Sequence, residues 1–431
     1  MTRRLRSLPG IPCSLFLLLA LSLSACGPEA SQSSEELPTA EVPEDLEAKA
    51  RRLTQEMILV DTHVDVPYRL TETPADISRA TESGDFDYPR AKAGGLDAPF
   101  MSIYVPASYQ KTGGAKEVAD ELIDMVEGFV TDAPDKFALA TSPAAVRENS
   151  RAGKISLPLG IENGAPVEDD LANLQHFYDR GVRYITLAHS ENNQICDSSY
   201  STERQWNGLS PFGREVVAEM NRLGIMVDIS HVSDETFYQV MELSQAPVIA
   251  SHSSCRKFTP GFERNMDDDM IRLLAEKGGV IHINFGSAFI SETTNRQSQE
   301  VWAKVGAFME EHGLDRGAPE VQEFIETYRR ENPIQLATVE DVADHIDHVV
   351  EIAGIDAVGI GSDYDGVGPT LPEGLKDVSQ YPNLVRVLLE RGYSEEDLGK
   401  LLGGNSLRVW EQVEAKAKEL QGANAESPSA G

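Results

Sequence analysis

The chain has 431 residues, 41% of them hydrophobic and 25% charged, which is ordinary for a globular protein with a large core. Its 38 basic and 70 acidic residues give a formal net charge of −32. A surface this acidic repels phosphate backbones and anionic lipid headgroups, so the charge argues against nucleic acid as a partner. It serves solubility and identifies no substrate.

The N-terminus has the pattern of an export signal. Three arginines lie among the first six residues, and the apolar run from Cys13 to Leu23 that follows is too short to span a membrane. The run ends in Leu-Ser-Ala-Cys, which resembles the bacterial lipobox, in which the cysteine is lipidated and becomes the first mature residue. We therefore predict a lipoprotein signal peptide at residues 1–25 and an exported protein held in the cell envelope by acyl chains on Cys26. An ordinary signal peptide with a small-residue cleavage site is the alternative.

The rest of the chain divides into one domain with two polar ends. Residues 26–45 are rich in Ser, Glu, Pro and Ala and are predicted to form a disordered tether, and residues 418–431 a disordered tail. Residues 46–417 show no internal repeat or linker and are expected to form a single domain. Its two cysteines, Cys196 and Cys255, are compatible either with a disulfide or with two inert thiols.

Short apolar runs alternate with longer amphipathic stretches through this domain, a pattern typical of a parallel sheet covered by helices. The predicted helical stretches are Lys116–Phe129, Leu171–Arg180, Pro211–Leu223, Asp234–Ser244, Asp267–Lys277 and Val339–Ala353. The eight predicted strands are Ile58–Val64, Phe100–Val105, Ile155–Ile161, Arg183–Ala188, Met226–Ser230, Pro247–Ser251, Gly279–Asn284 and Ala357–Ser362. Eight such units predict an α/β fold, a (β/α)8 TIM-like barrel. The long connection between strands seven and eight predicts a helical insertion at about Ser287–Pro333.

Polar residues follow six of these strands. In a barrel of this kind the C-terminal ends of the strands converge on one mouth, where active sites lie. The residues at these ends are His63 with Asp65, Glu162, His189, His231, His252 and Asp363. The histidines of helical stretches, His176, His312, His345 and His348, are expected at the surface or in packing, and His282 lies inside the seventh strand and points away from its C-terminal end.

This combination of imidazoles and carboxylates suits catalytic zinc. His63 and Asp65 are two residues apart in a strand, so their side chains point to the same side and can hold the same ion. Glu162 lies in an apolar context, and a buried carboxylate needs a positive partner, which two cations could supply. Any one of these histidines, taken alone, is more often a buried residue hydrogen-bonded to backbone. Asp65 alone could cap a turn, and Cys255 is a weaker candidate ligand.

Eight segments resemble the renal, or membrane, dipeptidase family of zinc peptidases (peptidase family M19), a branch of the amidohydrolase-type barrels. They are VDTHVD, GIENG, YITLAHS, DISHVS, IASHSS, ERNMDDD, IGSDYDGV and LPEGLKDVSQYPNL, and they span about Ile58 to Val409. The His-x-Asp at the first strand discriminates well, because most relatives in the wider superfamily carry His-x-His there. The stretch Glu191–Tyr200 does not follow the family closely, so that stretch and the insertion leave the side-chain preference open.

The resemblance implies a role for each residue of the mouth. Two Zn²⁺ ions per chain would generate a bridging hydroxide that hydrolyses the peptide bond of dipeptides, and the family often forms homodimers. His63 and Asp65 match ligands of the first zinc, Glu162 the bridging carboxylate, and His231 and His252 ligands of the second. His189 matches a histidine that steadies the scissile carbonyl, Arg264 the arginine that pairs with the substrate's carboxylate, and Asp363 the acid–base aspartate.

Several alternatives stay open at this point. Arg264 could instead form a surface ion pair with Glu263 or Asp267, and Asp365 rather than Asp363 could be the reactive acid. The same zinc core would also serve a binuclear deacylase that cleaves N-acyl amino acids. A catalytically inactive lipoprotein that uses the barrel for binding is the third possibility.

Overall fold

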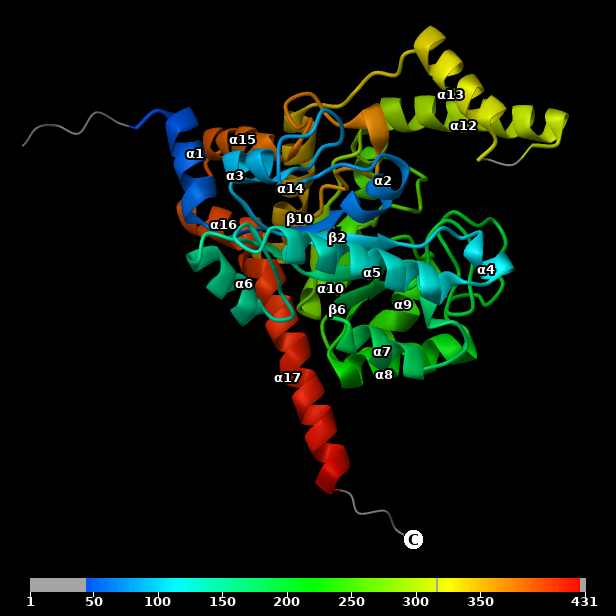
Figure 1. Cartoon of the computed structure of the whole chain (residues 1–431), viewed down its shortest axis with the longest axis horizontal. Coiled ribbons are helices and arrows are strands. Elements are labelled where there is room, and N and C mark those ends of the chain that lie inside the picture. The colour runs from blue at the N-terminus through cyan, green and yellow to red at the C-terminus, as the bar shows by residue number, and fades with distance from the viewer. Residues whose placement is uncertain (1–43, 315–316, 427–431) are drawn as a thin grey trace, which may run out of the picture. The chain divides into compact units, whose positions relative to one another are not determined.

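Eight parallel strands form a closed barrel in a computed structural model, which describes residues 44–314 and 317–426 (Figure 1). The strand order around the barrel is β1-β10-β9-β8-β7-β6-β5-β2. The strands are β1 (Leu59–Val64), β2 (Leu96–Tyr104), β5 (Leu159–Glu162), β6 (Val182–Thr186), β7 (Met226–Asp228), β8 (Ile249–Ser253), β9 (Val280–Ile283) and β10 (Val358–Ile360). The predicted (β/α)8 TIM-like barrel is confirmed.

Helices surround the strands, as Figure 1 shows. Several begin where the sequence offers a cap: Ser142, Ser210 and Ser233 each accept a hydrogen bond from a first-turn amide, and Thr338 forms a capping box with Asp341. The helices outside the insertion are α1 (Leu46–Glu56), α2 (Val66–Glu72), α3 (Tyr88–Gly94), α4 (Tyr109–Thr112), α5 (Ala115–Asp132), α6 (Pro143–Arg151), α7 (Ala172–Asp179), α8 (Pro211–Leu223), α9 (Asp234–Leu243), α10 (Asp268–Glu276), α14 (Val339–Ala353), α15 (Tyr381–Glu390), α16 (Glu395–Gly399) and α17 (Asn405–Glu426).

An apolar layer fills the part of the barrel that lies away from its C-terminal mouth. The ring of Phe100 lies 5.4 Å from the rings of both Tyr184 and Trp410, the last of these supplied by α17. A side chain at Gly160 would collide with the Tyr184 ring, because a Cβ there would lie only 2.0 Å from it, so this glycine makes room for the ring. With this part of the barrel filled by apolar side chains, its C-terminal mouth is the place for the polar groups of an active site.

The predicted insertion is helical. It consists of α11 (Ser287–Ile290), α12 (Glu292–His312) and α13 (Pro319–Glu331), between β9 and α14. Helices α12 and α13, yellow in Figure 1, pack on each other through a small apolar cluster of their own. The buried members of that cluster are Val301, Val305, Val321 and Ile325.

Two expectations about elements were wrong. The predicted third strand divides at Pro158, which has no amide hydrogen to donate to a ladder. Its first part, β4 (Ile155–Leu157), pairs with β3 (Phe137–Leu139) outside the barrel, and only its second part is the barrel strand β5. The chain also stays helical beyond residue 418, because α17 continues to Glu426 and the Gln421 side chain donates to the carbonyl of Arg222.

The two cysteines of the domain do not form a disulfide. Cys196 and Cys255 are both free and buried, and burial raises the pKa of each thiol, so they are two inert thiols.

Cys26, the signal peptide and nearly all of the expected tether lie outside the described residues. Within the described residues, none of the helices is both long and apolar enough to cross a membrane.

Candidate metal centre

The polar residues that follow the strands meet at the mouth of the barrel. Each of the four histidines places its Nε2 atom within 3.5 Å of a Glu162 carboxylate oxygen. Three groups of these side chains could each hold a metal ion, since their ligand atoms lie within 4.8 Å of one another. The groups are His63–Glu162–His252, Glu162–His189–His231 and His63–Asp65–Asp363.

Glu162 lies at the centre of this cluster. Its Oε1 atom is 3.1 Å from His231 Nε2 and 3.3 Å from His252 Nε2, whereas its Oε2 atom is 3.5 Å from His63 Nε2. Burial alone would raise the pKa of Glu162, but the surrounding imidazoles, His189 and His63 foremost, hold that pKa well below its usual range. An ionised carboxylate with one oxygen toward His63 and the other toward His231 and His252 has the geometry of a bridge between two cations.

The side of the cluster near β1 places two carboxylates, Asp65 and Asp363, against one imidazole, that of His63. His63 Nε2 lies 3.4 Å from Asp65 Oδ2, yet neither His63 Nε2 nor Asp65 Oδ1 has a hydrogen-bond partner among the described residues. Burial and the charge of Asp65 raise the pKa of Asp363 well above its usual range. Burial lowers the pKa of His63, but Tyr184, Asp65 and Glu162 outweigh it, so this pKa is raised well above its usual range. A divalent cation would satisfy these orphaned atoms and both carboxylates.

The other imidazoles are suited to act as metal ligands in their neutral form. Burial and then the charge of Arg264 lower the pKa of His231 well below its usual range, and burial followed by His63 lowers the pKa of His252 to about 3. Neutral imidazole is the form that coordinates a metal. The donor set contains nitrogen and carboxylate oxygen without a thiolate, which fits zinc.

The backbone at the mouth is shaped to bring two carboxylates together. His231 and Asp363, each the third residue after its strand, adopt left-handed conformations with φ of 67° and 65°. Gly366 lies so close that a Cβ atom there would come within 2.2 Å of both Asp363 Oδ1 and Asp65 Oδ2. A glycine is therefore required beside these carboxylates.

Arg264 belongs to the site and not to the surface. It is 3% exposed; its Nη1 atom donates to Ser253 Oγ at 2.7 Å and its Nη2 atom to the His252 carbonyl at 2.7 Å. Its Nε atom has no hydrogen-bond partner among the described residues, which leaves a donor for an anion. The alternative of a surface ion pair with Glu263 or Asp267 is wrong, because Glu263 pairs with Arg204 and Asp267 with Arg256.

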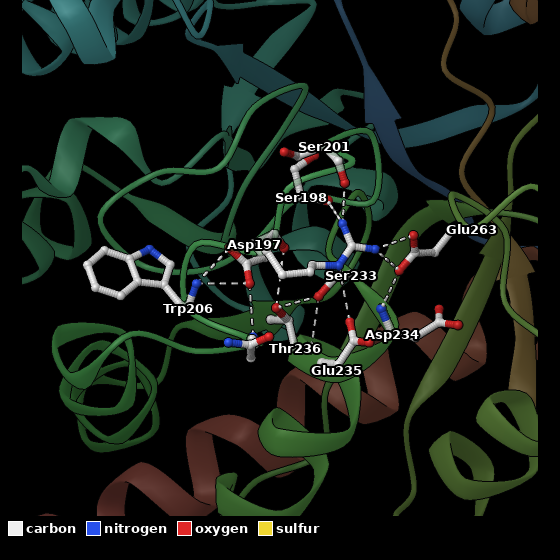
Figure 2. Close-up of polar contacts among 12 residues, drawn as sticks. Asp197, Ser198, Ser201, Trp206, Ser233, Asp234, Glu235, Thr236 and Glu263 are labelled. Carbon is white, nitrogen blue, oxygen red and sulfur yellow. Dashed lines mark hydrogen bonds and ion pairs between the residues drawn. The ribbon is translucent and has the colours of Figure 1, made fainter.

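The loop between β6 and α8 forms one wall of the mouth. Arg204 from this loop donates to the carbonyls of Ser198 and Ser201 and pairs with Glu263, while the Asp197 carboxylate accepts the amides of neighbouring loop residues (Figure 2). The Arg204–Glu263 pair joins the loop to the residue that precedes Arg264. Tyr200, on the same loop, has its ring 5.9 Å from the His231 ring.

Asp365 is held away from the mouth. Its Oδ2 atom accepts from Arg69 Nε at 2.9 Å and its Oδ1 atom from the Asp85 amide at 2.6 Å. Burial and the charge of Asp85 raise the pKa of Asp365 to about 7, although Arg69 opposes this. The alternative that Asp365 is the reactive acid is therefore not supported by its contacts.

Sequence reasoning missed two neighbours of the site. Asn284 donates from Nδ2 to Asp363 Oδ2 at 2.7 Å, and its position as the last residue of the predicted seventh strand was the available signal. Tyr184 places its hydroxyl 2.9 Å from His63 Nδ1, and no pattern in the sequence marked this pair.

The fold and this donor set define the class of barrel proteins with a carboxylate–imidazole metal centre at the mouth. The sequence model of the membrane dipeptidase family (peptidase family M19) matches residues 47–424. The chain therefore belongs to this family of metallo-dipeptidases.

Solved structures of similar chains agree. The probable dipeptidase PvdM from Pseudomonas aeruginosa is 28% identical, with 87% of this chain and 100% of that chain covered and a TM-score of 0.75. The metallopeptidase dipeptidase AC, of the same family, is 27% identical over 83% of this chain and 98% of that one, with a TM-score of 0.68. A metallopeptidase from Rhodobacter sphaeroides, liganded with a phosphinate mimic of the dipeptide L-Ala-D-Ala, is 26% identical over 83% and 99% respectively, with a TM-score of 0.68.

Glu162→Gln tests the central position of this carboxylate. The substitution removes the negative charge that lies between His63 on one side and His231 and His252 on the other. We therefore expect the metal-free variant to take up fewer than two tightly bound zinc ions per chain. Zinc titration against a chelating dye measures the count, with His312→Asn, an exposed histidine on α12, as the control. Two tight sites in Glu162→Gln would contradict the bridging role.

Proposed function

We propose that the protein hydrolyses the peptide bond of dipeptides with two zinc ions held on either side of Glu162. His63 and Asp65 would hold the first ion, and His231 and His252 the second. The observation that supports this most is the central buried carboxylate, with one oxygen toward His63 and the other toward His231 and His252. Bound zinc would supply a water molecule of lowered pKa as the nucleophile and would polarise the scissile carbonyl.

Asp363 is suited to move the proton. Its Oδ2 atom is held by Asn284, which leaves Oδ1 next to Asp65 on the side where the water would lie. It would take the proton of the attacking water and pass it to the leaving amine. His189, whose side chain is 20% exposed at the rim, would donate a hydrogen bond from Nε2 to the carbonyl oxygen as negative charge develops there.

Arg264 and Tyr200 are suited to recognise the free carboxylate of a short peptide. The Arg264 guanidinium is already oriented by Ser253 and by the His252 carbonyl, with Phe289 at 5.4 Å from it, and its Nε donor is unpaired. A buried guanidinium binds a carboxylate through two parallel hydrogen bonds. Tyr200, 43% exposed, adds a hydroxyl next to it. A site that binds the substrate's carboxylate next to the metals favours dipeptides over longer chains.

The relative from R. sphaeroides bound to a mimic of L-Ala-D-Ala guides the choice of substrates. We propose dipeptides that include a D-residue at the C-terminal position among the substrates of this chain. The deacylase alternative predicts the opposite preference at the amino end, since it would favour N-acyl amino acids.

Asp363→Asn tests the acid–base role and the substrate class together. We expect the zinc-loaded variant to lose about 100-fold or more in kcat on a simple dipeptide, because the proton relay contributes on that order. The wild type should cleave the free-amine dipeptide faster than its N-acetylated form. Turnover of the acetylated form alone would favour the deacylase, and no turnover of either would favour the inactive binding protein.

Arg264→Lys tests recognition of the carboxylate. We expect kcat/KM for a dipeptide to fall about 10- to 100-fold, because a lysine cannot replace the two-pronged hydrogen bond. Hydrolysis of the corresponding dipeptide amide, which lacks the carboxylate, should change much less. An equal loss on both substrates would assign Arg264 to the packing of the site.

We also propose that the mature protein is exported and anchored to the cell envelope through lipid on Cys26, a proposal supported by the Leu-Ser-Ala-Cys sequence alone. We expect the full chain expressed in bacteria to sediment with membranes and the Cys26→Ser variant to leave that fraction. Sedimentation of the variant with membranes would contradict the lipid anchor.

A further inference from the structure

Asp228, the last residue of β7, is a buried carboxylate that the proposed reaction does not use. Among the described residues it forms no ion pair with Lys or Arg. Its Oδ1 atom accepts the amides of Ser230 at 3.0 Å and Ser251 at 2.8 Å. Its Oδ2 atom accepts the hydroxyls of Thr186 and of Ser251, the latter at 2.6 Å. Four donors, two of them backbone amides, thus converge on this carboxylate.

The position of the protons follows from these contacts. Ser251 Oγ carries a single hydrogen, and it donates this hydrogen to Asp228 Oδ2, because a carboxylate oxygen can only accept. Its other hydroxyl neighbour, Ser230 Oγ, is 3.4 Å away. Ser251 Oγ can therefore only accept from His252 Nδ1, which lies 2.7 Å away. His252 must then carry its hydrogen on Nδ1 and a lone pair on Nε2, the atom that faces Glu162 at 3.3 Å. His252 Nε2 also lies 2.8 Å from His231 Nε2, which has a lone pair because Arg264 Nη2, 3.0 Å away, can only donate. The two lone pairs therefore converge, as those of two ligands of one ion do.

We propose that Asp228 and Ser251 are positioning residues that fix the tautomer of His252 and so keep its Nε2 atom free for the second metal ion. The inference rests on the proposed two-metal site. Its physical basis is general: a hydrogen bond on one ring nitrogen of a histidine determines whether the other can bind a metal. Neither residue touches the substrate or the metal in this account.

A second histidine of the barrel supplies the matched control. His282 on β9 donates from Nδ1 to the Ala250 carbonyl at 2.9 Å, so the hydroxyl of Ser406, 2.9 Å from Nε2, must donate to the ring. Here a hydroxyl occupies the ring nitrogen that His252 leaves open. Ser406→Ala therefore removes a comparable buried hydroxyl–imidazole bond away from the mouth.

Asp228→Asn should reverse the direction of this hydrogen-bonded chain. The carboxamide oxygen must keep accepting the amides of Ser230 and Ser251, since a backbone amide can only donate. The carboxamide nitrogen then replaces Oδ2 and donates to Ser251 Oγ, which in turn donates to His252 Nδ1. The hydrogen of His252 moves to Nε2, where it blocks the metal. In the double variant Asp228→Asn/Ser251→Ala this link is broken, and His252 can again present a lone pair.

The experiment titrates zinc into the metal-free protein in competition with a chelating dye, and circular dichroism checks the fold of each variant. We expect Asp228→Asn to weaken the second zinc site about 10- to 100-fold, the range typical of such supporting residues. The double variant should bind the second zinc more tightly than Asp228→Asn does, and Ser406→Ala should bind as the wild type. A purely structural role of Asp228 would make the double variant equal to or weaker than the single one.

The outcomes separate the two proposals. A wild type with fewer than two tight zinc sites would contradict the proposed function. Two sites in the wild type, with unchanged affinity in Asp228→Asn or no recovery in the double variant, would overturn only the role of Asp228. If Asp228→Asn does not fold, Ser251→Ala and Ser251→Thr decide: we expect Ala to weaken the second site, Thr to preserve it, and equal affinities to overturn the inference.

Discussion

The site depends on one constraint, a carboxylate that is buried among imidazoles and still ionised. Burial would raise the pKa of Glu162, yet four histidines from four different strand ends hold it well below its usual range. That arrangement satisfies Glu162 itself but leaves His63 Nε2 and Asp65 Oδ1 without partners, and it places Asp363 against Asp65. Cations on both sides of Glu162 would resolve each of these deficits, which is why the structure is best understood as a metal centre.

The apolar packing layer and the residues of the metal centre lie at different heights along the axis of the barrel. Phe100, Tyr184 and Trp410 pack together away from the mouth, whereas the residues of the metal centre lie at the C-terminal ends of the strands. Tyr184 joins the two layers, because its ring packs below while its hydroxyl lies 2.9 Å from His63 Nδ1. Next to His63, whose ring stacks on the His252 ring at 3.7 Å, the Asp228–Ser251 pair holds His252. His63 and His252 are therefore oriented from within the barrel, and the loops around the mouth remain available for substrate selection.

Much of this arrangement could be predicted from the sequence, because strand ends in a parallel barrel must converge. The alternation of apolar runs predicted the barrel, and the residues directly after those runs predicted His63, Glu162, His231, His252 and Asp363 as neighbours. Contacts that depend on long loops could not be predicted: the Arg204–Glu263 pair and the position of Tyr200 have no periodic signal. The hydrogen-bonded chain through Ser251 was missed for another reason, since it is set by side-chain rotamers inside the barrel. The division of the third strand at Pro158 could have been predicted, because proline has no amide hydrogen to donate to a strand ladder.

The central claim is that two cations bind on either side of Glu162. A crystal structure of the zinc-loaded protein, with anomalous scattering measured at the zinc edge, tests it most directly. The account predicts two anomalous peaks at the mouth, each within about 2.2 Å of one Glu162 oxygen, one next to His63 and Asp65 and the other next to His231 and His252. A single peak, or two peaks of which only one contacts Glu162, would contradict it.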